Sequence, residues 1–447
     1  MTGASRWADD EADKAEAARR KKEKEEKKRA KLAKQQAEQE AARRSRQEAE
    51  GRPAKRRRLS KSLEEESAKP IEAKLLRFET PGWGPCRHSN NFETLNHIEE
   101  GSYGWVSRAK EISTGEIVAL KKVKMDYVND GFPITALREI SVLQKARHQN
   151  IVDLKEIIMG DGLDDVILVM EFLEHDLKTL QEDMSEPFLA SEIKTLLRQL
   201  ASAVEFLHDN YIMHRDLKTS NILLNNRGLL KLADFGMARL IPPPNAPLTQ
   251  LVVTLWYRAP ELLLGTTTYD MSIDMWSVGC IFGELLAKEP ILQGKNEVDE
   301  LSKIFELCGL PNDNSWPEFY RLPNAKSLKL PRDPKNAGSV IRTKFPFLTN
   351  SGSELLSSLL SLNPEGRPAA KEMLAHPYFR ENPKPKPMEM FPTFPSKAGQ
   401  EKRRRRSPNA PKRGEAPGMG MGDIDFSSIF AGREEEQKGA GFTLRMV

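Results

Sequence analysis

Residues 211–239 limit what this chain can fold into more than any other part of its sequence. They contain an H-R-D motif that ends at Asp216, an asparagine five residues later at Asn221, and a D-F-G motif that begins eighteen residues after Asp216, at Asp234. Two short apolar runs lie between Asn221 and Asp234, and their pattern predicts a hairpin. A hairpin at this place would bring the three polar side chains close together.

This set of side chains is typical of enzymes that transfer phosphoryl groups. The transfer needs a carboxylate that orients the attacking hydroxyl, and Asp216 suits that role. It also needs oxygen ligands for Mg²⁺, which Asn221 and Asp234 can supply. Either motif alone is common in surface loops and helix caps. Their order and spacing, with Lys218 between them, argue against a coincidence.

Composition places the folded part in the middle of the chain. The 447 residues are 38% hydrophobic, and the charged residues gather toward both ends. The three cysteines, Cys86, Cys280 and Cys308, are too few for a disulfide scaffold and predict reduced, intracellular thiols. The sequence has no apolar run of membrane-spanning length and no signal-peptide pattern, so we expect a soluble protein without a membrane segment.

Both ends predict disorder, with a partly helical, solvated arm as the alternative for residues 9–50. Residues 1–90 form a charged arm in which residues 9–50 lack the apolar seam of a coiled coil. Residues 52–59 are a basic run beside a proline, typical of a nuclear-localisation signal, with a merely solvated charge run as the alternative. Residues 380–447 form a Pro-, Arg- and Gly-rich tail. Weak association with RNA or RNA–protein complexes through these basic ends is an accessory hypothesis.

Residues 91–173 predict a small β-rich lobe. Two strands flank a glycine turn at Gly101 and Gly104, where the backbone can lie close to phosphates. A V-A-x-K pattern then ends at Lys121, which would contact the α- and β-phosphates. Pro133 begins an amphipathic helix that carries Glu139, the expected ion-pair partner of Lys121. The apolar strand at residues 166–173 suits the wall and hinge of an adenine pocket.

Residues 174–379 predict a larger helical lobe. Residues 191–208 have helical spacing and would form a core helix that delivers the catalytic loop. An A-P-E motif ends at Glu261. We expect Asp274 to brace the catalytic loop from below, and Arg367 to pair with Glu261 as a buried structural bridge.

Three longer segments resemble cyclin-dependent protein kinases across roughly residues 92–379. They are P-I-T-A-L-R-E from Pro133, V-V-T-L-W-Y-R-A-P-E-L-L-L-G from Val252, and D-M-W-S-V-G-C-I-F-G-E-L-L from Asp274. Within that group, H-R-D-L-K-T-S-N and the tail M-F-P-T-F-P resemble the PITSLRE-type kinases. The PISSLRE-type kinase is the alternative, because it also resembles the G-T-T-T run from Gly265 and the tail.

The resemblance implies an α+β fold, the bilobal eukaryotic protein-kinase fold, with an N-lobe at 91–173 and a C-lobe at 174–379. It implies a serine/threonine kinase that uses ATP and Mg²⁺, depends on a cyclin of the L type, and acts on Ser/Thr-Pro sites. Transcription, pre-mRNA splicing and cell-cycle proteins are the expected substrates. The expected location is the nucleus, with the cytoplasm as a second place. A pseudokinase scaffold is the rival class, against which the intact catalytic residues argue.

The resemblance also assigns roles to single residues. Catalysis falls to Asp216, Lys218, Lys121 and Glu139, and metal binding to Asn221 and Asp234. Thr249 would be an activating phosphosite, Ser102 and Tyr103 would be inhibitory ones, and Val253 would shape the pocket for the substrate proline. The phosphate on Thr249 would be bound by Arg138, Arg215 and Arg239. The expected nucleotide contacts are Ile98, Gly101, Ser102, Tyr103, Gly104, Val106, Ala119, Lys121, Met170, Glu171, Leu173, Asp176 and Leu223.

Overall fold

A computed structural model describes residues 85–101, 104–125, 131–162, 164–241, 248–249, 252–330, 338–395, 411 and 424–425. The chain divides into two units, Met1–Gly82 and Trp83–Val447, and all the described residues belong to the second. Residues 1–84 of the predicted arm, with the basic run at residues 52–59, and Ser102 and Tyr103 therefore lie outside the described residues. No helix among the described residues is long and apolar enough to cross a membrane.

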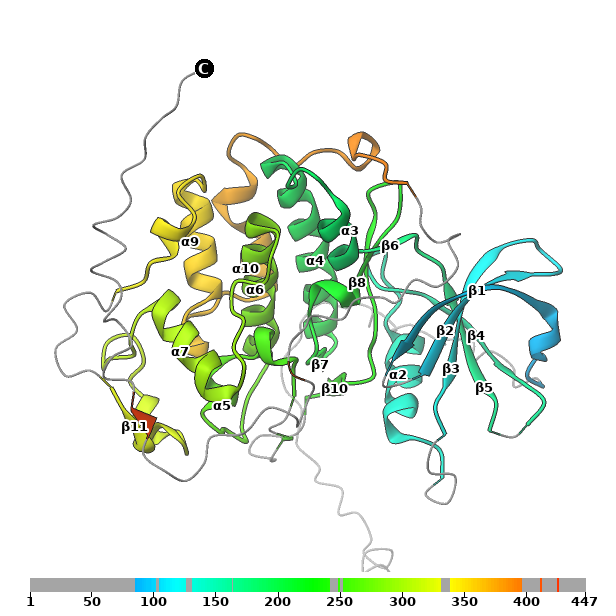
Figure 1. Cartoon of the computed structure of the whole chain (residues 1–447), viewed down its shortest axis with the longest axis horizontal. Helices are drawn as coiled ribbons and strands as arrows, with labels where there is room; N and C mark the ends of the chain where they lie inside the picture. Colours follow the sequence, from blue (N-terminus) through cyan, green and yellow to red (C-terminus); the bar gives the residue numbers. More distant parts are fainter. Residues whose placement is uncertain are drawn as a thin grey trace, which may run out of the picture. The chain divides into compact units, whose positions relative to one another are not determined.

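The N-lobe is built on a five-stranded antiparallel sheet in the order β1-β2-β3-β5-β4 (Figure 1). Its strands are β1 (Phe92–Gly101), β2 (Gly104–Glu111), β3 (Ile117–Val123), β4 (Leu154–Met159) and β5 (Val166–Glu171), and helix α2 (Ile134–Lys145) follows β3. At Gly104, φ is 157° and a Cβ atom would lie 2.0 Å from the carbonyl oxygen of Lys122. Only glycine permits this close pairing of β2 with β3.

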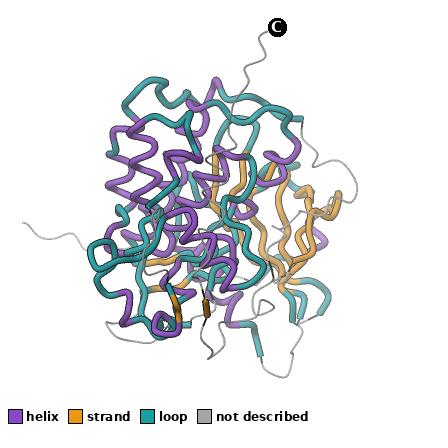
Figure 2. Tube along the Cα trace, turned by 60° about the vertical axis from the view of Figure 1, so that its left-hand side comes forward, coloured by secondary structure: helices purple, strands orange, loops and turns teal. Residues whose placement is uncertain are grey.

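The C-lobe is mainly helical, and Figure 2 shows its helices gathered apart from the strands of the N-lobe. Helix α6 is apolar on all sides and lies in the core, where Trp276 and Phe282 are fully buried. The α-helices described in this lobe are α3 (Leu177–Asp183), α4 (Ala190–Asp209), α5 (Pro260–Leu263), α6 (Ser272–Ala287), α7 (Glu297–Cys308), α8 (Ile341–Lys344), α9 (Asn350–Leu359) and α10 (Ala370–Ala375).

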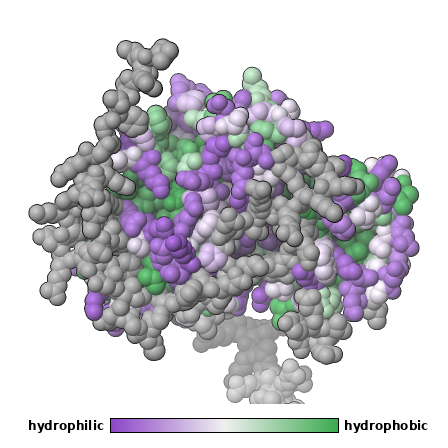
Figure 3. All heavy atoms as spheres, viewed as in Figure 1, coloured by the Kyte–Doolittle hydropathy of each residue, from purple (hydrophilic) through white to green (hydrophobic). Residues whose placement is uncertain are grey.

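Short strands complete the lobe, and β7, β8, β9 and β10 flank the catalytic motifs in the sequence. Strands β6 (His175–Asp176), β8 (Ile222–Leu224) and β9 (Leu230–Leu232) form one sheet in the order β6-β8-β9. Strand β7 (Ile212–Met213) pairs with β10 (Arg239–Leu240), and β11 (Leu328–Lys329) pairs with β12 (Ile424–Asp425). The hairpin predicted between Asn221 and Asp234 is thus β8–β9. On the face seen in Figure 3, hydrophilic side chains predominate and apolar ones form separate patches.

Two boundaries of the sequence analysis are wrong. The predicted arm ends at residue 90, yet Arg87 already lies against the N-lobe sheet. Its guanidinium pairs with Glu111 at 2.7 Å, and its carbonyl oxygen accepts from the N–H of Met159 at 3.1 Å.

The predicted tail begins at residue 380, yet residues 380–395 are placed against the C-lobe, with Phe391 buried to 6% exposure. Composition suggests disorder because Pro and Lys dominate the segment, whereas Phe391 and Phe394 supply enough apolar surface to hold it on a preformed lobe. We call residues 381–395 the C-terminal strap.

A buried glutamate in α7 makes stability depend on pH. Glu300 is 0% exposed, and its Oε2 accepts a hydrogen bond from the N–H of Gly294 at 2.6 Å. Burial raises the pKa of Glu300 to about 8, although the hydrogen bond from Gly294 lowers it. An unfolded glutamate titrates near pH 4.3, so the folded state keeps this proton up to a higher pH than the unfolded state does. Stability contributed by the proton therefore falls as pH rises from about 5 to about 8.

We expect Glu300→Gln to remove this fall, because glutamine keeps an oxygen for Gly294 but does not titrate. Its advantage over the parent in free energy of unfolding should grow between about pH 5 and pH 8 by at least about 1.4 kcal/mol, the equivalent of one pKa unit. Denaturant unfolding at both pH values measures this difference. Glu306→Gln, at an exposed position of the same helix, is the control. Its difference from the parent in free energy of unfolding should be the same at both pH values. The same pH-independent difference for Glu300→Gln would contradict the prediction.

Candidate active site

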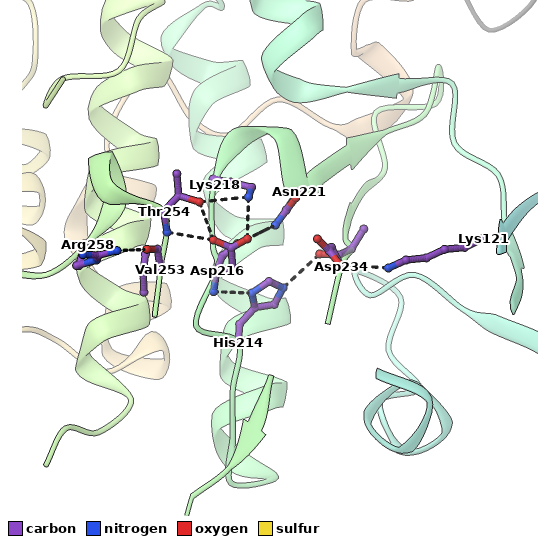
Figure 4. A network of polar contacts seen from close by, with 10 residues as sticks. Lys121, His214, Asp216, Lys218, Asn221, Asp234, Val253, Thr254 and Arg258 are labelled. Carbon is purple, nitrogen blue, oxygen red and sulfur yellow. Dashed lines mark hydrogen bonds and ion pairs between the residues drawn. The ribbon is translucent and has the colours of Figure 1, made fainter. Parts of the chain in front are cut away.

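Asp216 is the centre of a hydrogen-bonded group of catalytic-loop and activation-segment residues (Figure 4). Its Oδ2 accepts from Nζ of Lys218 at 2.7 Å. Its Oδ1 accepts from Oγ1 and from the backbone N–H of Thr254 at 2.8 and 3.2 Å. Lys218 also donates to Oγ1 of Thr254 at 3.2 Å. These contacts fix the direction of the carboxylate and place a cation beside it.

Asp274 holds the catalytic loop from the first turn of α6, as the sequence predicts. Its two carboxylate oxygens accept the backbone N–H groups of His214 and Arg215, each at 2.9 Å. Oδ2 also lies 3.1 Å from Nε2 of His208. Burial alone would raise the pKa of Asp274, but the hydrogen bonds from His208 and from the backbone N–H of Arg215 lower it. The carboxylate is therefore charged at neutral pH, and it anchors a loop whose residue Arg215 has an unusual φ of 65°.

His214 links the catalytic loop to the D-F-G segment. Its ring is fully buried, and burial lowers its pKa. The neutral ring lies 3.2 Å from the carbonyl oxygen of Ala233 through Nε2, and Nδ1 lies 3.3 Å from the N–H of Asp216. Because a carbonyl only accepts, the proton belongs on Nε2 and Nδ1 accepts from Asp216. The ring also contacts Phe235 edge-on, with centroids 4.9 Å apart.

Lys121 lies between two carboxylates. Its Nζ is 2.6 Å from Oε1 of Glu139 on α2 and 3.2 Å from Oδ1 of Asp234. Burial opposes the positive charge of Lys121, but the two carboxylates raise its pKa above the usual value. Burial would likewise raise the pKa of Asp234, yet Lys121 and Lys218 lower it to about 2. The predicted pairing of Lys121 with Glu139 is therefore present.

The predicted metal ligands fit Mg²⁺. The side-chain nitrogen of Asn221 donates to the backbone oxygen of Asp216 at 2.9 Å and lies 3.3 Å from Oδ2 of the same residue, so the amide oxygen points away from Asp216. The backbone carbonyl oxygen of Asn221 accepts from the N–H of Ala233 at 2.9 Å, which keeps Asn221 next to Asp234. Mg²⁺ is held in such enzymes by one or two protein oxygens together with phosphate oxygens and water. An amide oxygen and a carboxylate make such a donor set.

The predicted nucleotide contacts come from both lobes. Met170 and Leu173 are buried to 8% exposure at and after the end of β5. The carboxylate of Glu171 accepts from the N–H of Asp153 at 2.7 Å and also pairs with Lys231. Asp176 caps α3 by accepting from Thr179 N–H at 2.8 Å. The remaining described residues of the set lie on N-lobe strands or on β8, namely Ile98, Gly101, Gly104, Val106, Ala119 and Leu223.

The structure adds two residues to which the sequence analysis assigned no role. Thr254 donates twice to Asp216, as described above. Arg258 donates to the carbonyl oxygens of Val252 and Val253, each at 3.0 Å, and pairs with Glu297 at 2.7 Å. Arg258 is 4% exposed. Its position inside the apolar segment before A-P-E was a usable signal, because a buried arginine needs several acceptors.

The predicted phosphate-binding arginines are near one another. The pKa of Arg215 is lowered first by burial and also by the charges of Arg239 and Arg138. Nη1 of Arg215 donates to the hydroxyl of Tyr269 at 3.0 Å, and this hydroxyl donates to the carbonyl oxygen of Thr249 at 2.8 Å. Thr249 is exposed. The contact between Arg215 and Thr249 is therefore indirect and passes through Tyr269.

The buried bridge predicted between Glu261 and Arg367 is present. Nη1 and Nη2 of Arg367 lie 2.6 and 2.7 Å from the two carboxylate oxygens of Glu261. Arg367 also donates to the backbone carbonyls of Ser361, Ser272 and Leu362, and its guanidinium lies 5.0 Å from the ring centroid of Trp276. The bridge thus ties the A-P-E segment to the end of the domain.

Comparison with known proteins agrees with this geometry. The sequence model of the protein kinase domain matches residues 92–379. "Serine/threonine-protein kinase ppk23" of Schizosaccharomyces pombe is 54% identical over 319 residues, which are 71% of this chain and 80% of that protein. "Cyclin-dependent kinase 11" of Dictyostelium discoideum is 50% identical over 314 residues, covering 70% of this chain and 87% of the relative.

A human relative matches over a longer segment. "Cyclin-dependent kinase 11B" of Homo sapiens is 45% identical over 386 residues, which are 84% of this chain and 48% of that protein. The chain thus spans about half the length of this relative. The comparisons support the PITSLRE resemblance over the PISSLRE alternative. The chain belongs to the protein kinase family and, within it, to the cyclin-dependent serine/threonine kinases of the PITSLRE type.

Proposed function

We propose that this chain is the catalytic subunit of a cyclin-dependent kinase that transfers the γ-phosphate of ATP to Ser or Thr followed by Pro. The backbone of Val253 carries the substrate preference. Its φ is 65°, its carbonyl oxygen accepts from Arg258, and its N–H donates to the carbonyl oxygen of Arg215 at 3.0 Å. Both polar groups are engaged within the chain. A substrate residue beside Val253 would find no acceptor there, and proline has no N–H to satisfy.

Each catalytic residue has a proposed role in the transfer. Asp216 accepts a hydrogen bond from the substrate hydroxyl and orients its oxygen toward the phosphoryl group. Lys218, 2.7 Å from Asp216, balances charge on that side. Lys121, held by Glu139, donates to the nucleotide phosphates. Asn221 and Asp234 would hold Mg²⁺, which would neutralise part of the phosphate charge.

Two peptides that differ only after the serine test this proposal. We expect kcat/KM for Ser-Pro to exceed that for Ser-Ala by about 10- to 100-fold, because an unpaired N–H costs about 1–3 kcal/mol. A Ser-(N-methylalanine) peptide lacks the N–H and the ring, and it should recover most of the rate. Equal rates for Ser-Pro and Ser-Ala would refute the substrate assignment without touching the kinase assignment.

A cyclin is the proposed activating partner. Helix α2, which carries Glu139, exposes Ile134 and Leu137 at 65% and 52%. Exposed apolar side chains on a helix that positions a catalytic residue favour a protein partner at that face. The family resemblance favours an L-type cyclin. Purification from cells should recover it with the parent chain and lose it with Leu137→Asp, whereas recovery of an M-type cyclin would contradict this choice.

Thr249 is the proposed activating phosphosite. A phosphate there would lie near the charges of Arg138, Arg215 and Arg239 and would form charge-assisted hydrogen bonds with them. Phosphatase treatment should lower kcat of the parent and leave Thr249→Ala unchanged. Equal loss in both proteins would place the regulatory phosphate elsewhere.

The nucleus is the proposed location, with transcription and splicing proteins as substrates. The support is the basic run at residues 52–59 and the family resemblance. Deletion of residues 52–59 should move a fluorescent fusion toward the cytoplasm. An unchanged location would contradict the proposed nuclear targeting.

Weak RNA association through the ends should be steeply salt-dependent and should disappear when residues 1–80 and 400–447 are removed. RNA binding that survives this removal would contradict the proposed association.

A further inference from the structure

The C-terminal strap runs along the C-lobe toward the strands that flank the nucleotide site. In Figure 1 it is the orange segment that passes over α4 and α3 in the direction of β6. Its contacts fall into two groups, one on α4 and one at the β6-β8-β9 sheet. The two groups together show what the strap holds in place.

The first group fixes the strap to the beginning of α4. The backbone N–H of Lys386 donates to the carbonyl oxygen of Ser191 at 3.0 Å, and the carbonyl oxygen of Lys386 accepts from Oγ1 of Thr195 at 2.7 Å. The Lys386 ammonium lies 2.9 Å from the carboxylate of Glu192. Both backbone groups and the side chain of one strap residue are thus bound to one helix. This end of the strap has a definite register.

The second group begins at the β8–β9 turn. Gly228 has a φ of 74°, and a Cβ at this position would lie 2.7 Å from Cβ of Phe391 and 2.9 Å from the carbonyl oxygen of Met388. The strap and the turn therefore touch at a distance that only glycine permits. On its other side, the carbonyl oxygen of Gly228 accepts from Nε2 of Gln199 on α4 at 2.9 Å. The turn is held between α4 and the strap.

Phe394 and Asn226 connect the strap to β6. The ring of Phe394 contacts the rings of Phe188 and His175, with centroid distances of 6.2 and 6.0 Å. Oδ1 of Asn226 accepts from the backbone N–H of Phe394 at 3.0 Å and lies 3.2 Å from Nε2 of His175. An amide oxygen only accepts, so His175 donates through a protonated Nε2. One atom thus joins the strap, the β8–β9 turn and β6.

The residues that the strap contacts are next to the proposed nucleotide contacts in the sequence and in the β6-β8-β9 sheet. His175 is followed by Asp176, and these two residues pair with Leu224 and Leu223 of β8. Asn221 lies just before β8, and Asp234 lies two residues after β9. A shift of β6 against β8 would move Asp176 relative to Leu223. The strap is placed to prevent that shift.

We propose that the C-terminal strap positions the nucleotide-binding edge of the β6-β8-β9 sheet, with Phe394 and Asn226 as the positioning residues. The inference rests on the proposed nucleotide contacts of Asp176 and Leu223. Phe391 offers a matched comparison, since it is an aromatic strap residue that packs against Phe188, with centroids 6.1 Å apart, and reaches the turn at Gly228. If the strap only stabilised the fold, substitution of Phe391 and of Phe394 would change the ATP constants to the same extent.

The test compares Phe394→Ala with Phe391→Ala in the full chain bound to its cyclin. We expect Phe394→Ala to raise both the KM for ATP and the Kd for a fluorescent ATP analogue by about 3- to 10-fold, with kcat and peptide KM within about twofold of the parent. Phe391→Ala should lower Tm at least as much, because its ring is more deeply buried, and leave the ATP constants within about twofold. Equal changes in the ATP constants, or none, would overturn the proposal.

A second variant covers the case in which Phe394→Ala does not fold. Asn226→Ala keeps the ring of Phe394 and removes the oxygen that binds both the Phe394 N–H and His175, and it should weaken binding of the ATP analogue in the same direction. Unchanged binding would overturn the proposal independently. Binding of the analogue is measured without phosphoryl transfer, so a failure of the proposed Ser/Thr-Pro specificity remains a separate result.

Discussion

Asparagine in place of Asp216 is expected to lower kcat by about 10²- to 10⁴-fold, the range that a positioned acid–base group contributes. The substitution removes the negative charge that Lys218 and Thr254 now face with three donors. An asparagine NH₂ group would face donors itself, and its oxygen accepts a proton far less well. The KM for ATP should change by less than about threefold, because Asp216 is assigned to the hydroxyl and not to the nucleotide. Steady-state kinetics of the cyclin-bound chain measures both constants.

Asp209→Asn is the matched control for this substitution. Asp209 is an exposed residue at the end of α4, so the same chemical change there should leave kcat within about twofold. Thermal unfolding of both variants separates a chemical effect from a folding defect. If Asp216→Asn kept more than a tenth of the parent kcat, the proposed role of Asp216 would be lost.

The largest expected loss of stability comes from Arg367→Ala, at about 3–5 kcal/mol. The substitution leaves the carboxylate of Glu261, which is 4% exposed, buried without its bidentate partner. It also removes the donors of three backbone carbonyls and the group that stacks on Trp276. Denaturant unfolding followed by tryptophan fluorescence measures the change, with the midpoint and the slope fitted separately.

A second Arg–Glu pair in this chain provides the control. Arg321 and Glu318 lie 2.5 Å apart on the surface, with side chains 80% and 67% exposed. Arg321→Ala should cost no more than about 1 kcal/mol, because water screens an exposed pair. The double variant Arg367→Met/Glu261→Leu should regain much of the lost free energy of unfolding, because it leaves no buried charge without a partner. Equal losses for Arg367→Ala and Arg321→Ala would show that burial does not govern the strength of this bridge.

Local patterns in the sequence were sufficient for much of the fold and for the catalytic residues. The spacing from Asp216 to Asn221 and Asp234 is fixed by one short hairpin, so its members meet whatever the rest of the chain does. Helix α4 and strand β5 were recognisable because each has a strong apolar period. The predicted limits, 191–208 and 166–173, differ by no more than two residues from Ala190–Asp209 and Val166–Glu171.

Contacts between distant segments cannot be predicted from local sequence patterns. The hydrogen bonds from Thr254 to Asp216 span 38 residues, and that from Phe394 to Asn226 spans 168. No period or propensity of either segment specifies such a partner. The strap was assigned to the tail for the same reason, because its two aromatic residues are stabilising only on a lobe formed by other segments. The roles of Thr249 and of the cyclin-facing helix stay predictions.

The docking of the strap bears on how catalytic fragments of this kinase are cut for inhibitor screening. A fragment that ends at Phe379, where the family match ends, would lack every contact that Phe391 and Phe394 make with Phe188 and His175. Such a fragment would keep all the catalytic side chains but lose the contacts that join β6 and the β8–β9 turn to the strap. On the proposed role of the strap, it should bind ATP-competitive compounds more weakly than the full chain does.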